Sequence, residues 1–415
     1  MHSMRSSYKL TSVVATLVMV VSACSSAATT APASQPAATS AAAGSSAPLT
    51  GSLTVWEAYG ASGTSEKDAF DKMVANVKAA NPGLTVTVTD IPFNNLFTNF
   101  ETQAGAGAGP DLYIAPNDSL PKEARAGLLK DVSNLVPVLK AAPYNESDVS
   151  LSAATVDGKL YEIPESMKAV ELFYNTSMLP TAPVTTADWK ANASKLGWVY
   201  GANGGGSYYL WGLFSSFGGK IMDASGKCIA DQGGVADALK WLQDMKAAGM
   251  HFYQNDNDAK ADLISGKIAG FIDGPWQSGD LSKALPGKLA VVAGPSGPGG
   301  AWAPLTAPDG FYINAASANG DLAVKFALQM LQPQNEQIFA NVGHLPANTT
   351  IQPSDPIAKS FAALMAKGDP RPTLKQLDNY WSNFGNALVA VIDKGTDPVS
   401  AVKTACDAMN KANGL

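Results

Sequence analysis

The pattern of hydrophobic and polar residues in the first part of the chain predicts alternating strands and helices. Residues 53–56, 84–89 and 112–115 are short runs typical of strands, and apolar residues recur at helical spacing after Ser65 and again over 93–104. Ser65 and Asp68 have the spacing of a capping box, which predicts where the first helix begins. Strands joined by helices pair through right-handed crossovers, so this segment predicts a parallel sheet.

Strands and helices also alternate in the remainder of the chain, which indicates an α/β protein. Residues 126–132 and 156–161 are predicted to continue the sheet, the second of them around a hairpin turn at Asp157 and Gly158. The glycine- and proline-rich residues 294–308 are predicted to cross between two domains. A further strand is predicted at 172–175, and helices are predicted at 189–195, 208–217, 235–248, within 316–331, and at 334–341, 355–367, 378–394 and 397–411.

A predicted strand that ends next to a tryptophan is the segment most suggestive of a ligand site. The apolar residues 268–272 run into Asp273-Gly274-Pro275, a turn that neither a helix nor a central strand continues through. Trp276 follows, and a rigid turn would hold its indole where it can cover a flat ligand. Residue type alone favours burial of Trp276 in the core, because large aromatic side chains are usually well buried.

Length and composition set the class of protein. A chain of 415 residues is long enough for two or three compact units, and 46% hydrophobic with 15% charged residues is typical of a well-packed globular protein. The net charge is −6, and lysine and arginine are scattered instead of clustered. Nucleic-acid partners are therefore excluded, since they require a basic surface.

The first 23 residues have the pattern of a signal peptide. Arg5 and Lys9 precede an apolar stretch at 10–21, and small residues follow it up to Cys24. This ending resembles the lipobox of bacterial lipoproteins, in which the cysteine becomes the lipid-bearing N-terminus. We therefore expect an extracytoplasmic protein that is anchored to the cell membrane only through lipid on Cys24. The alternative is an ordinary secretory signal that contains a cysteine.

Residues 24–50 are predicted to be a flexible tether. They consist almost entirely of alanine, serine, threonine and proline, with few large apolar side chains. Such a segment cannot bury enough surface to offset the entropy lost on ordering.

Two further cysteines, Cys228 and Cys406, form an even pair in a chain expected to lie outside the cytoplasm. Thiols can oxidise there, so we expect a disulfide between these two residues. Sequence alone does not show that they approach within bonding distance.

The sequence carries no pattern for a metal or a nucleotide, and we expect no cofactor. The histidines are His2, which leaves with the signal, and His251 and His344, which lack ligand spacing. The spaced glycines at 105–109 precede a strand instead of linking a strand to a helix, as a nucleotide loop would. Asn117 and Asp118 follow the strand at 112–115, and ligands of open α/β sheets bind at the carboxyl ends of strands.

Short motifs distributed along the chain match one family in order and spacing. The motifs are Gly-Pro-Asp (109–111), Ala-Gly-Leu-Leu (126–129), Asp-Gly-Lys-Leu-Tyr-x-Ile-Pro (157–164), Phe-Tyr-Asn (173–175), Phe-Gly-Gly (217–219), Ile-Asp-Gly-Pro-Trp (272–276), Ile-Asn-Ala-Ala-Ser (313–317), His-Leu-Pro-Ala-Asn (344–348) and Tyr-Trp (380–381). Through them the chain resembles the periplasmic solute-binding proteins of carbohydrate ABC importers, most closely the maltose/maltodextrin-binding group, over residues 53–415.

This resemblance implies a type II periplasmic-binding fold, with two α/β lobes of mixed or parallel sheets joined by a three-segment hinge. Lobe I is expected at 51–166 plus 311–345, and lobe II at 170–306 plus 350–415. It also implies a monomer that traps a sugar in the cleft between the lobes and delivers it to the transmembrane subunits of an ABC permease.

The resemblance carries roles over to four residues. Trp276 and Trp381 match the stacking tryptophans of lobe II, Tyr208 matches a tyrosine beneath the sugar, and Asp118 matches a carboxylate that accepts from sugar hydroxyls. An aromatic plane suits the flat C–H face of a pyranose, and paired donors and acceptors suit its hydroxyls. Asn117 lies beside Asp118 and joins the predicted site.

Other positions depart from the maltose-binding pattern. The family's tryptophan and arginine in lobe I fall at Ala115 and Ser119, and a loop acidic residue falls at Lys168. Its lobe I lysine falls at Asn95, and the first loop has Glu57 and Tyr59 in place of an Asp-Lys pair. These departures leave the identity of the sugar open, but Glu57, Tyr59, Asn95 and Lys168 are still predicted to bind the ligand, because they hold the positions of the family's binding residues. Tyr59, Phe93 or Phe97 could supply an aromatic ring from lobe I, and each could equally be packing.

Two other functions remain as alternatives. One is a binder of another polar solute, such as a non-glucan oligosaccharide or a glycerol phosphodiester, although a phosphodiester would call for more arginines than this chain has. The other is an extracytoplasmic glycoside hydrolase, which needs two carboxylates at a controlled separation. Its candidates by residue type are Glu57, Asp111, Asp118, Glu165 and Asp273, and none has a local signature. No enzymatic activity is therefore predicted.

Overall fold

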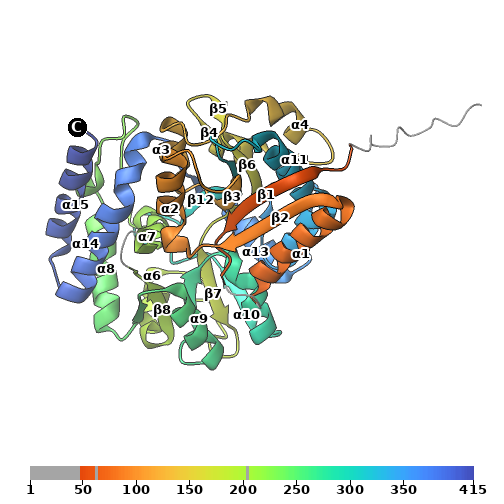
Figure 1. Ribbon diagram of the computed structural model, residues 1–415. Coiled ribbons are helices and arrows are strands. Elements are labelled where there is room, and N and C mark those ends of the chain that lie inside the picture. The colour runs from red at the N-terminus through yellow and green to blue at the C-terminus, as the bar shows by residue number, and fades with distance from the viewer. Residues whose placement is uncertain (1–46, 61–63, 202–204) are drawn as a thin grey trace, which may run out of the picture. The chain divides into compact units, whose positions relative to one another are not determined.

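The chain builds two β-sheets, which a computed structural model describes for residues 47–60, 64–201 and 205–415 (Figure 1). Both belong to one compact unit, Pro48–Leu415. The first sheet has the strand order β13-β6-β12-β3-β1-β2, and β14 pairs with β12 outside that path. β1 is parallel to β2 and β3, whereas β12 is antiparallel to β3 and β6. The strands are β1 (Thr50–Glu57), β2 (Gly83–Asp90), β3 (Leu112–Pro116), β6 (Glu162–Lys168), β12 (Leu305–Ile313), β13 (Leu345–Pro346) and β14 (Asp369–Pro370).

Alternating side chains of the first sheet pack into an apolar core on each of its faces. Leu53 and Val55 of β1 pack on one face with Phe70 of α1, whereas Trp56 packs on the opposite face with Phe100 of α2. The predicted strand-helix-strand start and its parallel pairing are confirmed. The helices of these cores are α1 (Ser65–Ala80), α4 (Val136–Lys140), α5 (Asp148–Ala153), α11 (Gly320–Met330) and α12 (Pro333–Ala340) on the first face, and α2 (Phe93–Gly105) and α3 (Leu120–Arg125) on the second.

The second sheet has the strand order β11-β7-β10-β8-β9, with β7 antiparallel to both of its neighbours and β8 parallel to both of its own. One large core joins it to its helices. The strands are β7 (Glu171–Asn175), β8 (Leu196–Val199), β9 (His251–Tyr253), β10 (Gly270–Asp273) and β11 (Leu289–Val292). The helices are α6 (Thr186–Ala191), α7 (Gly205–Ser216), α8 (Val235–Ala247), α9 (Asp256–Ser265), α10 (Ser278–Ala284), α13 (Pro356–Met365), α14 (Tyr380–Lys394) and α15 (Pro398–Ala412).

Five segments of the described chain lead from the first sheet and its helices to the second, or back. Three of them join β6 to β7, β11 to β12, and β13 to α13, whose Ile357 and Phe361 lie in the core of the second sheet. The other two enter and leave the short strand β14, which lies between α13 and α14 in the sequence. This arrangement agrees with the fold class expected from the sequence. The exact lobe boundaries given there stay predictions.

Two segments that were predicted to continue the first sheet do not belong to it. Residues 126–132 make only one isolated bridge, Leu129 to Asn314, because Gly127 turns the chain at positive φ and the following amides bond to separate carbonyls. Residues 156–161 form β5 (Lys159–Leu160), which pairs with β4 (Thr155–Val156) as a separate ribbon. The predicted turn at Asp157 and Gly158 is confirmed, since both residues have positive φ.

One other local prediction is wrong, and another is right over most of its length. Ser65 does not form a capping box, because its backbone N–H and hydroxyl both donate to Asp280 of α10, at 3.0 and 2.7 Å. Most of the predicted crossing segment 294–308 does join the second sheet to the first, and only residues 305–308 belong to β12, whose pairing with β6 is irregular between Asp309 and Gly310.

Cys228 and Cys406 form a disulfide that joins the segment before the short 3₁₀ helix Ala230–Gln232 to α15, with Cα atoms 5.4 Å apart. The expected pairing is confirmed. Cys24, which was predicted to carry lipid, lies outside the described residues. Among the described helices, none combines the length and apolar character needed to cross a membrane.

Candidate functional site

Trp276 lies directly after β10, in a short 3₁₀ helix (Pro275–Gln277). The turn before it is held by the buried carboxylate of Asp273, which accepts from the backbone N–H of Gly274 at 2.8 Å and the hydroxyl of Tyr209 at 3.1 Å. A methyl group at position 274 would lie 1.9 Å from Cζ3 of Trp276, so only glycine lets the indole fold back over its turn. The ring of Tyr208, from α7, lies 6.4 Å from that of Trp276.

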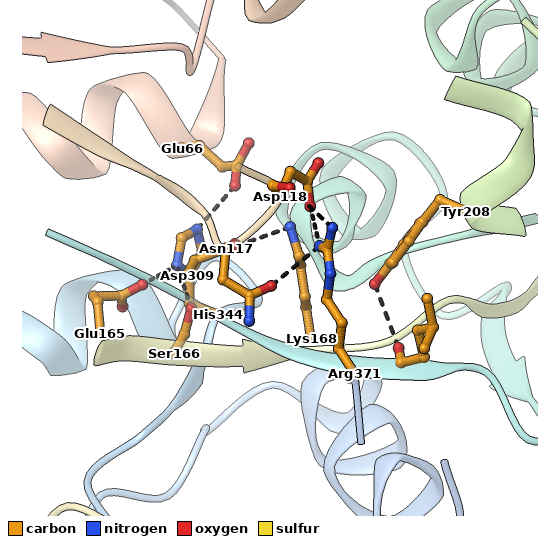
Figure 2. A network of polar contacts seen from close by, with 11 residues as sticks. Glu66, Asn117, Asp118, Glu165, Ser166, Lys168, Tyr208, Asp309, His344 and Arg371 are labelled. Atoms are coloured by element: carbon orange, nitrogen blue, oxygen red, sulfur yellow. Dashed lines mark hydrogen bonds and ion pairs between the residues drawn. The ribbon is translucent and has the colours of Figure 1, made fainter. Parts of the chain in front are cut away.

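A lysine of the first sheet faces these two rings. The Nζ of Lys168, at the end of β6, lies 5.6 Å from the ring centroid of Trp276 and 5.8 Å from that of Tyr208. It also pairs with Asp309 of the adjacent β12, with 2.8 Å between Nζ and Oδ1 (Figure 2). Antiparallel pairing of β6 and β12 brings the two charges together, because Ala307 lies opposite Lys168 in the register.

Arg371 connects Trp381 to the carboxyl end of β3. Its guanidinium donates to Asn117 Oδ1 at 3.1 Å, to the carboxylate of Asp118, and to the backbone oxygen of Asp118 at 3.1 Å (Figure 2). The central carbon of the guanidinium lies 4.3 Å from the ring centroid of Trp381. Burial alone would raise the pKa of Asp118, but the charges of Arg371 and Lys168 outweigh burial and hold that pKa below its usual range.

His344 links two carboxylates that are distant in the sequence. Its Nδ1 lies 2.8 Å from Glu165 of β6 and its Nε2 lies 2.8 Å from Glu66 of α1 (Figure 2). Its ring stacks on Phe339, with centroids 4.1 Å apart. Burial would lower the pKa of His344, but the two carboxylates raise it well above 6.5, so the ring is a cation at neutral pH.

A cavity of about 10 Å³ lies where these groups meet. It is lined by Glu66, Ser166, Met167, Lys168, Pro275, Trp276, Asp309 and His344. We use the term central cluster for the ten residues labelled in Figure 2 together with Trp276 and Trp381. The cluster contains ion pairs from the first sheet and aromatic rings from the second.

Six of the nine predicted ligand-binding residues lie in the central cluster. They are Trp276, Trp381, Tyr208, Asp118, Asn117 and Lys168. Arg371 was not among the predicted site residues, and His344 was considered only as a metal ligand and rejected for lack of ligand spacing. Their partners are separated from them by more than 170 positions, so no local pattern could have identified either residue.

Of the remaining three, Tyr59 borders the central cluster, and Glu57 and Asn95 are not among its residues. Glu57 is fully buried at the end of β1, where it accepts from the backbone N–H of Tyr59 at 2.7 Å, and burial raises its pKa to about 7. The Tyr59 ring packs between Phe70 and Phe339, at 5.4 and 5.5 Å, and makes an edge contact with the ring of His344 at 6.1 Å. Asn95 is exposed on α2. Ligand contacts of these three residues stay predictions.

Comparison with known proteins gives the family. Residues 72–366 match the model of the bacterial extracellular solute-binding proteins. The chain belongs to this family. The resemblance inferred from the sequence motifs is thereby confirmed.

Three relatives illustrate this solute-binding family. A galactooligosaccharide-binding protein of Bacillus subtilis is 25% identical over 381 residues, which cover 86% of this chain and 88% of the relative. A maltooligosaccharide ABC transporter solute-binding lipoprotein of Streptococcus pneumoniae is 24% identical, over 74% of this chain and 75% of the relative. The structure of the Thermus thermophilus maltotriose-binding protein bound with maltotriose has a TM-score of 0.76 and 25% identity, over 87% of this chain and 100% of that one. The expected type II fold is confirmed.

Proposed function

We propose that this protein binds a neutral oligosaccharide between its two sheets and presents it to an ABC permease, without changing the sugar chemically. The observation that carries the proposal is the convergence of Trp276, Tyr208 and Trp381 with charged groups of the first sheet. Indole and phenol rings suit the C–H face of a pyranose, and the carboxylates and amides suit its hydroxyls. The names of the relatives, which bind galacto- and malto-oligosaccharides, support the same ligand class.

The charges of the central cluster favour a neutral ligand over an anionic one. Lys168 is paired with Asp309, and Arg371 is paired with Asp118. His344 is paired with both Glu66 and Glu165. A phosphodiester would need cations that are not already neutralised, because removing its charge from water is costly. This pairing therefore argues against glycerol phosphodiesters.

The same pairing argues against a glycoside hydrolase. Such an enzyme needs one protonated and one ionised carboxyl flanking the scissile bond. Asp118 instead has a lowered pKa and an arginine partner, so it is not a proton donor at neutral pH. The buried carboxyl of Asp273, whose pKa burial raises, is used to hold the turn before Trp276.

Membrane attachment is the last part of the proposal. Lipid on Cys24 and a tether that is shorter than the predicted 24–50, because Leu49 packs in the core of the first sheet and Thr50 begins β1, would keep the binding unit near the permease. Radiolabelled palmitate should therefore be incorporated into the full-length protein expressed in a bacterium, and Cys24→Ala should abolish incorporation. Labelling of the variant would contradict this part alone.

Calorimetric titration of the purified protein tests the ligand. The panel is malto-oligosaccharides of two to seven units, galacto-oligosaccharides, trehalose and glycerol phosphodiesters. We expect saturable binding of at least one neutral saccharide and none of the phosphodiesters. Chromatography after long incubation should recover the saccharide intact. Binding of phosphodiesters alone, or released hydrolysis products, would overturn the proposal.

A further inference from the structure

The two tryptophans of the central cluster differ in what covers them. The Arg371 side chain is 2% exposed and lies between Trp381 and Asp118, with its guanidinium 4.3 Å from the Trp381 ring centroid. At Trp276 the corresponding cation, Lys168, is 5.6 Å away, and the small cavity adjoins the ring. Trp276 therefore borders a space of about one water molecule and has a more distant cation, whereas one face of Trp381 is in direct contact with a guanidinium.

We propose that Arg371 is a specificity-determining residue, which competes with the saccharide for Trp381 and Asp118 and so sets the length of saccharide that binds best. This inference rests on the proposed function. A short saccharide on Trp276 leaves Arg371 in place. A longer one that reaches Trp381 has to displace it.

The displacement follows from the space available. A pyranose stacked on an indole lies at about the contact distance that the guanidinium already occupies, so the two groups exclude each other from the same ring face. Arg371 also uses the carboxylate of Asp118 and the amide oxygen of Asn117, the acceptors that a sugar hydroxyl would need. Binding of a saccharide at Trp381 therefore requires the loss of the hydrogen bonds that Arg371 makes, which are charge-assisted and stronger than neutral ones.

Other features make the displacement feasible. Within the described chain, Arg371 Nε and Trp381 Nε1 are both buried without a hydrogen-bond partner. An oxygen of the saccharide can accept from Trp381 Nε1, and a displaced Arg371 can donate from Nε to water, so both donors gain a partner. Asp118, at 33% side-chain exposure, stays accessible to solvent or ligand. The arginine belongs to the segment between β14 and the 3₁₀ helix Lys375–Asn379, where residues 372–374 are partly exposed.

Affinity as a function of saccharide length tests the inference. Kd is measured by calorimetry for malto-oligosaccharides of two to seven units, and for galacto-oligosaccharides of increasing length, with wild type and Arg371→Ala. We expect the variant to bind the longest saccharide about tenfold more tightly and the shortest within about twofold of wild type, because only the longest displaces the arginine. Arg371→Lys keeps the charge but lacks the planar stacking group. Its affinity for the longest saccharide should therefore lie between those of wild type and Arg371→Ala.

Arg125→Ala is the matched control. Arg125 donates to the backbone oxygen of Thr373 in the same segment, but its ion pair is with Asp157, outside the central cluster. Its removal should change all affinities equally or not at all. A uniform gain in Arg371→Ala, or weaker binding of long saccharides, would overturn the inference while wild-type binding upholds the proposed function. Failure of wild type to bind any saccharide would overturn both.

Discussion

The first sheet contributes charges to the central cluster, whereas the second sheet and its helices contribute rings. On the first-sheet side, His344 bridges Glu66 and Glu165, and Lys168 pairs with Asp309. On the second-sheet side, Trp276, Tyr208 and Trp381 are packed against the core but remain partly exposed. The difference suggests a division of roles. Paired charges fix the first-sheet side of the cluster, whereas the ring of Trp276 borders the cavity and that of Trp381 is covered by Arg371.

The bridge made by His344 gives the largest expected effect. His344→Gln removes a cation between two carboxylates, of which Glu165 is fully buried, so we expect a loss of about 3–5 kcal/mol in the free energy of unfolding. Urea denaturation at pH 6 measures it. Because the folded-state pKa of His344 is raised, its contribution is complete below the unfolded value of 6.5 and is lost as pH rises through the folded value.

His251→Gln is the control for the substitution itself. His251 lies partly exposed on β9 and stacks only on Tyr253, so its replacement should cost less than about 1 kcal/mol. Equal losses of stability in His344→Gln and His251→Gln would mean that the charge bridge does not support the fold. The structural role assigned to the charges of the first-sheet side would then be wrong.

The next largest effect concerns the rings. Trp276→Ala should weaken saccharide binding by about 2–4 kcal/mol, because truncating a central aromatic anchor removes much of an interface's affinity. Calorimetry on the saccharide identified in the panel measures the change. Trp241→Ala serves as the control, since Trp241 packs against Trp189 and Phe217 away from the central cluster. It should lower stability and leave Kd unchanged. Unchanged binding by Trp276→Ala would place the ligand elsewhere.

A smaller effect comes from a carboxyl of the first sheet that lies outside the cluster. Burial raises the pKa of Glu57 from 4.5 to about 7, so between these values the unfolded chain loses this proton while the folded chain keeps it. The free energy of unfolding therefore falls as pH rises through this window. Glu57→Gln stays neutral, and should be more stable than wild type by about 1–3 kcal/mol at pH 8 but equal to it at pH 4. A difference that does not vary with pH would contradict this assignment.

The smallest effect concerns a contact between helices of the two sheets. Asp280 of α10 accepts from the backbone N–H and hydroxyl of Ser65 at the start of α1. Asp280→Ala should cost about 1 kcal/mol of stability, as loss of a helix N-terminal acceptor does, and Asp280→Asn should cost less. Thermal unfolding monitored by circular dichroism measures both. Equal losses in the two variants would mean that charge, and not the accepted hydrogen bonds, stabilises this contact.

Local sequence pattern predicted most of the fold and only part of the site. Periodicity located the strands around Trp56 and Ile272, and the turn residues before Trp276 located its indole, because these features depend on neighbours in the chain. The failures have long-range causes. Ser65 is capped by a residue 215 positions away, and Arg371 meets Asp118 across 253 positions. Chain folding alone brings such pairs together, so spacing could not reveal them.

The disulfide between Cys228 and Cys406 closes a loop of 178 residues and secures the final helix of the chain. Cross-links that close long loops lower the entropy of the unfolded chain, which stabilises the folded state by several kcal/mol at room temperature. Protein produced in a reducing cytoplasm, or assayed with dithiothreitol, is therefore a covalently different molecule from the oxidised form. Free-thiol titration of each preparation should precede any measurement of melting temperature or sugar affinity.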